Sequence, residues 1–65
     1  MNNAVNIKII DNYIKENKLN KTKFCKLCKI SVYTFNKIMT NDNCQLIALF
    51  KIAKTMSIQI WELFA

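Results

Sequence analysis

Two cysteines three positions apart are the side chains in this sequence best suited to chemistry. Cys25 and Cys28 form a Cys-x-x-Cys motif, a spacing that can hold a metal ion or support redox chemistry. The 65 residues include no histidine and no second Cys-x-x-Cys, so the motif stands alone. Both thiols fall in a predicted helix beside Phe24 and Leu27. We therefore interpret them as buried structural thiols and expect no metal and no cofactor.

The other residue types exclude most catalytic chemistry. Without histidine there is no Ser-His or Cys-His dyad, and without glycine there is no phosphate-binding glycine loop. The four carboxylates are scattered along the chain and offer little material for paired-acid catalysis. We therefore expect a binding protein and not an enzyme.

Lysine carries every positive side chain of the sequence. Ten lysines, no arginine and four acidic residues give a formal net charge of +6. Six of the ten fall in one 15-residue window: Lys15, Lys18, Lys21, Lys23, Lys26 and Lys29. By itself such a cluster is more often a solvated face than a nucleic-acid site, and it favours an anionic partner only when it lies on a helix-turn-helix pattern. Because lysine lacks the bidentate fork of arginine, we expect modest affinity and strong salt dependence.

The length and the apolar pattern predict one domain, residues 1–65. No apolar run approaches the roughly 20 residues that cross a bilayer, and the first residues lack the basic start of a signal peptide. We therefore expect a cytoplasmic protein with reduced thiols and no membrane partner. The abundance of Lys, Asn and Ile suggests AT-rich coding DNA, and so a bacterial or phage-infected host cell. Cys44 stands near a predicted loop, and its role stays open.

Apolar residues recur at helical spacing along the whole chain and predict an all-α fold. The stripes indicate five short helices, at about residues 4–17, 21–28, 32–40, 45–56 and 58–64. Asn20 and Ser31 are expected N-caps, and Ser57 is expected to break the fourth helix. Asn17 and Lys18 should close the first helix, because asparagine tolerates a left-handed conformation. Nothing indicates a hairpin, so we expect a compact five-helix bundle.

The same stripes predict which side chains face the core. The inward positions are Ile7, Ile10, Ile14, Phe24, Leu27, Cys28, Phe35, Ile38, Met39, Leu46, Leu49, Phe50, Ala53, Ile60, Leu63 and Phe64. The opposite side of the third helix shows Tyr33, Asn36, Lys37 and Thr40. Trp61 either completes the core or lies outside with Ile60 and Phe64 as a patch for self-association.

Two stretches resemble a known family. Residues 19–38 (LNKTKFCKLCKISVYTFNKI) look like the helix-turn-helix of lambdoid phage repressors and Cro proteins, and of related bacterial regulators. Residues 49–64 (LFKIAKTMSIQIWELF) resemble the two helices that follow in that family. The resemblance covers most of the chain, from about Ile7 onward, and makes the second and third helices a helix-turn-helix.

The resemblance implies sequence-specific binding of double-stranded DNA. The positions that would read bases are Val32, Tyr33, Asn36 and Lys37, and those that would contact the DNA backbone are Lys21, Ser31, Thr34, Thr40, Asn41 and Asn43. Their chemistry suits these roles, because lysine can donate to guanine, asparagine can pair with adenine and valine can contact a thymine methyl.

Three departures from the family pattern bear on the structure. Cys25 stands where the family prefers alanine, and Lys29 stands where it prefers glycine in the turn. A residue other than glycine with positive φ costs about 1 kcal/mol or more, so we expect this turn to be strained or adjusted. Ile14 and Met39 occupy positions at which the family often pairs an arginine with a glutamate, and such an apolar replacement can be neutral or stabilising.

The resemblance also implies a homodimer that binds a near-palindromic operator. Members of the family commonly dimerise through the C-terminal region, here Ile60, Trp61 and Phe64, and the two reading helices would lie about 34 Å apart. We expect no small-molecule ligand, because no second domain is predicted. The function is therefore predicted to be transcription regulation, and a Cro-like repressor, a restriction-modification controller and an antitoxin all stay open.

Two other functions compete with this prediction. A charge of +6, abundant Lys and Ile, and a tryptophan also suit a cationic membrane-active peptide of the bacteriocin type. Against it, five packed helices would hide their apolar faces. The other alternative is a helix-turn-helix fold used for protein–protein contact alone.

Overall fold

Helices form the whole of the described structure. A computed structural model describes residues 5–40 and 45–64. Its elements are α1 (Ile7–Glu16), α2 (Lys21–Cys28), α3 (Val32–Met39), α4 (Leu46–Met56) and a 3-10 helix, η1 (Ile60–Phe64), with no strand in these ranges. The predicted all-α class is confirmed. The predicted fifth helix is a short 3-10 helix that begins two residues later than expected.

Polar side chains set where three of the α-helices begin. The Asn6 side chain accepts a hydrogen bond from the Lys8 amide at 3.2 Å, and Asn20 accepts one from the Lys23 amide at 2.8 Å. Ser31 Oγ accepts one from the Thr34 amide at 3.0 Å. Each bond satisfies an amide that has no partner inside its helix. The predicted caps at Asn20 and Ser31 are confirmed, and the Asn6 cap explains why α1 begins later than residue 4.

Left-handed residues close the helices in a chain that has no glycine. Lys29 and Ser57 follow α2 and α4 with φ of 59° each, and Lys18 follows α1 with φ of 54°. The turn at Lys29 and the break at Ser57 are confirmed. After α1, however, Lys18 is left-handed and Asn17 is not; the Asn17 side chain donates to the Tyr13 carbonyl at 2.9 Å and caps the helix.

The core is built around Phe24, which is completely buried. Its ring packs edge-on against Tyr13 of α1 and Phe35 of α3, with 5.8 Å between ring centroids in each pair. The other buried side chains are Val5, Ile10, Cys25, Cys28, Ile38, Ala48, Leu49, Ile52, Ala53 and Leu63. One continuous core therefore joins all five elements.

Three of the predicted core residues lie outside it. Leu27, Leu46 and Phe50 are each more than half exposed. Their helices instead bury small side chains, Cys25 on α2 and Ala48 on α4. Of the stripe that the spacing predicts on α4, Leu49 and Ala53 are buried, and Ala48 and Ile52 take the remaining inward positions because nearly every side of α4 carries apolar residues.

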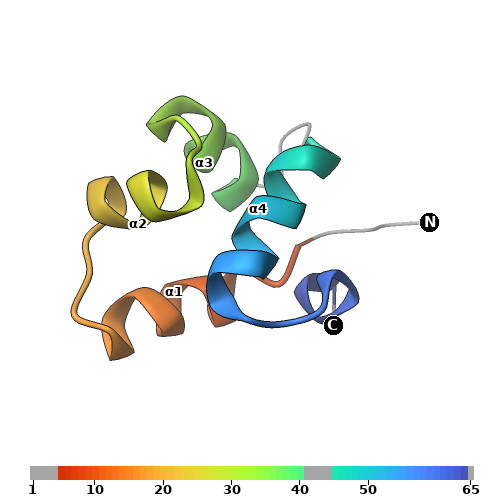
Figure 1. Cartoon of the computed structure of the whole chain (residues 1–65), viewed down its shortest axis with the longest axis horizontal. Coiled ribbons are helices and arrows are strands. Elements are labelled where there is room, and N and C mark those ends of the chain that lie inside the picture. The colour runs from red at the N-terminus through yellow and green to blue at the C-terminus, as the bar shows by residue number, and fades with distance from the viewer. Residues whose placement is uncertain (1–4, 41–44, 65) are drawn as a thin grey trace.

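The helices are arranged so that one side of α3 stays open. α4 packs against α2 and η1, and α2 packs against α3 (Figure 1). The Tyr13 hydroxyl donates to the Thr55 carbonyl at 3.3 Å and joins α1 to α4, and the Asn6 amide donates to the Leu63 carbonyl at 2.6 Å. The Cα radius of gyration of 10.6 Å matches the value of about 10.7 Å expected for a folded chain of this length.

Replacing Lys29 by glycine should stabilise the protein. Lys29→Gly removes the left-handed penalty, and we expect the free energy of unfolding to rise by about 0.5–1 kcal/mol. Lys26→Gly also removes one lysine charge, but from the interior of α2, and should lower the free energy of unfolding by about 1 kcal/mol. Urea unfolding followed by circular dichroism measures both. Destabilisation by both variants would contradict a strained turn at Lys29.

Candidate nucleic-acid interface

The outward face of α3 carries the four residues predicted to read bases. Tyr33 is 69% exposed, and Val32 and Asn36 are also exposed. Lys37 is half-buried. The opposite side of α3 is buried through Phe35 and Ile38, as the spacing predicts. Aromatic, amide, ammonium and apolar groups are thus displayed together on one helix.

Hydroxyl groups mark the start of α3. Besides capping the helix, Ser31 donates its hydroxyl proton to Thr34 Oγ1 at 3.0 Å. The proton of the Thr34 hydroxyl is therefore free to point to another acceptor. A phosphate oxygen is a suitable acceptor for such a group.

Lys37 and Tyr33 contact each other one helical turn apart. The Lys37 Nζ lies 5.3 Å from the centroid of the Tyr33 ring, which is within the range of a cation–π interaction. The contact folds the lysine back over the ring and explains why Lys37 is half-buried. The Lys37 ammonium group and the Tyr33 ring therefore form one contact unit on the surface of α3.

Lys21 and Asn36 come from different helices and meet beside this unit. The Lys21 Nζ donates to Asn36 Oδ1 at 3.3 Å, which joins the first turn of α2 to the middle of α3. Pairing of asparagine with adenine uses both the amide oxygen and the amide nitrogen. The amide oxygen has two lone pairs, so Asn36 can keep the bond to Lys21 and still accept from a base, and the Lys21 ammonium group has further protons for a phosphate.

A cavity of about 300 Å³ lies beside this pair. It is lined by Asp11, Ile14, Lys21, Phe35, Asn36 and Met39. The cavity brings together Ile14 and Met39, the apolar residues that stand where the resembled family often has an ion pair. Asp11 is held in an ion pair with Lys15 at 3.0 Å.

The remaining predicted backbone contacts are placed differently. The Thr40 hydroxyl lies 3.1 Å from the carbonyl oxygens of both Asn36 and Lys37, so its proton is directed back into α3. Asn41 and Asn43 lie outside the described residues. Among the described residues, Lys21 and Thr34 are the predicted backbone contacts with a donor that can turn outward.

The residues predicted for dimerisation are divided by the structure. Trp61 is 67% exposed, whereas Ile60 and Phe64 are half-buried against the core. Exposed apolar side chains on α4, namely Leu46, Ile47 and Phe50, were not predicted as surface. The sequence does contain an indication that this side of α4 is exposed. Lys51 and Lys54 mark the solvent side of the helix, and Ile47 lies one turn before Lys51.

The two thiols of the Cys-x-x-Cys motif are buried. Burial raises the pKa of Cys25, against an opposing effect of the Lys21 ammonium. Burial also raises the pKa of Cys28, opposed by the hydrogen bond with Thr55 and reinforced by Cys25. Both groups therefore stay protonated at neutral pH. Because these pKa values are raised by folding, the associated stability is present below the ordinary thiol pKa and is lost as the pH rises through the raised values.

Comparison with known proteins adds no relative. No family model, no curated protein and no solved structure matches the chain. The resemblance to phage repressors therefore rests on the quoted residues alone. In the described ranges, no helix is both long and apolar enough to cross a membrane.

The buried thiols should be protected from modification. In a Cys44→Ser variant at pH 8, we expect Cys25 and Cys28 to react with Ellman's reagent at least about 100-fold more slowly than in 8 M urea, since reaction requires opening of the core. Absorbance of the released thionitrobenzoate measures both rates. Equal rates with and without urea would contradict the burial of this motif.

Proposed function

We propose that the protein binds double-stranded DNA sequence-specifically as a small transcriptional regulator, either repressor- and Cro-like or controller-like. The observation that carries the proposal is the outward face of α3, where Tyr33, Asn36 and Lys37 gather beside Lys21. The net charge of +6 favours the approach of such a face to a polyanion.

The arrangement of α2 and α3 supports a helix-turn-helix. The two eight-residue helices are joined by residues 29–31, in which Lys29 is left-handed and Ser31 caps the next helix. Two helices joined by a turn of three or four residues are the ordinary form of this motif. In the proposal, α2 lies across the DNA backbone and α3 enters the major groove.

Each exposed residue of α3 has a proposed role in reading the operator. Val32 and Tyr33, at the start of the helix, meet base edges, where the valine contacts a thymine methyl. Lys37 donates to guanine O6 or N7, and Asn36 pairs with adenine. Lys21 and Thr34 donate to phosphates on either side of the helix.

We propose that the protein acts as a homodimer on a near-palindromic site. The exposed Trp61 supports this proposal, since a large exposed aromatic side chain is typical of an interface. The exposed apolar residues of α4 would enlarge the contact. Two copies would place their α3 helices in successive major grooves, about 34 Å apart.

Selection of bound duplexes from a random pool tests the DNA-binding proposal. We expect a near-palindromic consensus. On the selected duplex, Tyr33→Ala and Lys37→Ala together should weaken binding by at least about tenfold, because each contact contributes about 1–3 kcal/mol of discrimination. Fluorescence anisotropy at several salt concentrations measures the affinities, and log K should fall by about 0.9 per phosphate contacted.

The control for this test is Lys8→Ala, which removes an exposed charge of α1 and should weaken binding less than twofold. Absence of a consensus, with equal losses in both variants, would leave only nonspecific attraction. Leakage of anionic lipid vesicles at low protein concentration would instead support the membrane-active alternative.

The dimer is tested through the one tryptophan of the chain. As the wild-type concentration rises, Trp61 fluorescence should shift to shorter wavelength as its side chain leaves water. Trp61→Ser should weaken self-association by at least about tenfold in sedimentation equilibrium, because a buried interface aromatic is a frequent hot spot. Its unfolding midpoint should match that of the wild type, since Trp61 is exposed in the monomer. Unchanged association would exclude Trp61 from the interface.

A further inference from the structure

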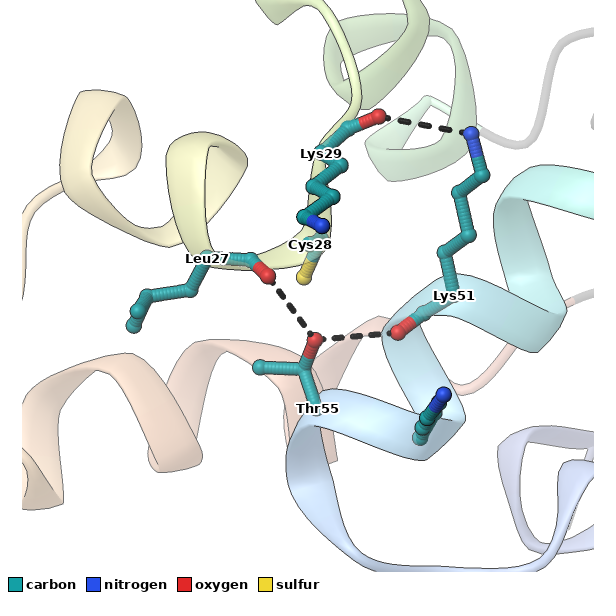
Figure 2. Close-up of a pocket in the computed structure, with 6 residues that line it drawn as sticks. Leu27, Cys28, Lys29, Lys51 and Thr55 are labelled. Carbon is teal, nitrogen blue, oxygen red and sulfur yellow. Dashed lines mark hydrogen bonds between the residues drawn. The ribbon is translucent and has the colours of Figure 1, made fainter.

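A second pocket lies between the C-terminal end of α2 and one side of α4. Its volume is about 500 Å³, and it is lined by Leu27, Cys28, Lys29, Lys51, Lys54 and Thr55. Figure 2 shows Cys28 and Lys29 at the end of α2 facing Lys51 and Thr55 of α4, with the Leu27 side chain at the edge of the pocket and pointing away from Lys51. We call this site the α2–α4 pocket.

Hydrogen bonds between the two helices hold the pocket in shape. The Thr55 hydroxyl lies 3.0 Å from the Lys51 carbonyl and 3.4 Å from the Leu27 carbonyl (Figure 2). The Lys51 Nζ donates to the Lys29 carbonyl at 3.4 Å. The two acceptors, the Leu27 and Lys29 carbonyls, lie at the C-terminal end of α2. Without these donors, the two carbonyls would need water as a donor. The pocket is therefore part of the packing of α2 on α4.

The chemistry of the pocket is both basic and apolar. Lys29, Lys51 and Lys54 supply three ammonium groups, and none of the described residues that line the pocket is acidic. Leu27 adds a side chain that is 56% exposed. Among the described residues, none of these three lysines forms an ion pair with a carboxylate: Asp11 pairs with Lys15, and Glu62 accepts a hydrogen bond from the Gln59 amide at 2.8 Å. No described carboxylate lines the pocket or pairs with its lysines.

We propose that the α2–α4 pocket binds an acidic, amphipathic segment of another protein. Carboxylates of the segment pair with Lys29, Lys51 and Lys54, and an apolar side chain packs on Leu27. The charge complementarity selects this occupant. A second copy of the chain has four carboxylates spread along its sequence and so offers no acidic segment for three lysines. A nucleic-acid backbone would satisfy the lysines but would offer nothing apolar to cover Leu27.

The pocket is separate from the proposed DNA contacts. None of its six lining residues is among those proposed to touch bases or phosphates. A partner held there can therefore bind while α3 is in the groove, so the site provides a way for another protein to be recruited or to regulate. This inference does not depend on DNA binding, and its test uses the chain without DNA.

The test uses a labelled helical peptide of 14 residues with Glu on one face and Leu on the other, and the same peptide with Gln in place of each Glu. Titration of the ¹⁵N-labelled full chain should shift the amide signals of the α2–α4 pocket first. Fluorescence anisotropy gives the affinities. Lys51→Gln with Lys54→Gln should weaken binding by at least about tenfold, and Leu27→Gln should weaken it by about fivefold or more.

The matched control is Lys8→Gln with Lys23→Gln, which also removes two charges, from exposed positions outside the pocket. It should weaken binding less than about twofold, and the Gln peptide should bind at least about tenfold more weakly than the Glu peptide. Equal losses in both double variants, amide shifts centred on α3, or no effect of Leu27→Gln would each overturn the proposal. Displacement of the peptide by a DNA duplex would reassign the pocket to nucleic acid. Urea unfolding confirms that each variant is folded.

Discussion

The packing of Phe24 is the interaction on which the rest of the structure depends. Its ring lies between Tyr13 and Phe35, so a single side chain of α2 fixes the positions of α1 and α3. Once Phe35 is turned inward to meet it, helical geometry turns Tyr33 and Asn36 outward. The position of the face proposed to read DNA therefore depends on how Phe35 anchors α3 to the core. Loss of that packing would displace Tyr33 and Asn36 even if neither residue were changed.

The absence of glycine is the second physical constraint. Lys18, Lys29 and Ser57 all take a left-handed conformation that costs other residues about 1–2 kcal/mol each. A chain of 65 residues has little stability to lose, since small domains bury a smaller share of their surface. Burial of one continuous core and side-chain caps at three helix starts offset these costs. The three-residue turn that contains Lys29 holds α2 close to α3.

The central position of α2 gives the molecule two distinct basic surfaces. Its first turn brings Lys21 to Asn36 on α3, and its last turn brings Leu27 and Lys29 to α4. The first surface is proposed for DNA and the second for an acidic partner. The separation follows from the length of α2, because eight residues at 1.5 Å each place its ends about 12 Å apart. Each surface takes one lysine of the cluster at residues 15–29, Lys21 or Lys29, and adds lysines from another helix.

Local interactions explain what the sequence by itself determined. The α2 boundaries, the Asn20 and Ser31 caps and the outward face of α3 were all predicted, because caps and helical periodicity act within a few residues. The tertiary structure alone decided that Leu27 lies outside the core and that Lys21 bonds Asn36. The hydrogen bond joins residues that are distant in the chain, and the burial depends on which apolar face of a helix packs against a neighbouring helix. The spacing of apolar residues along the sequence does not specify either.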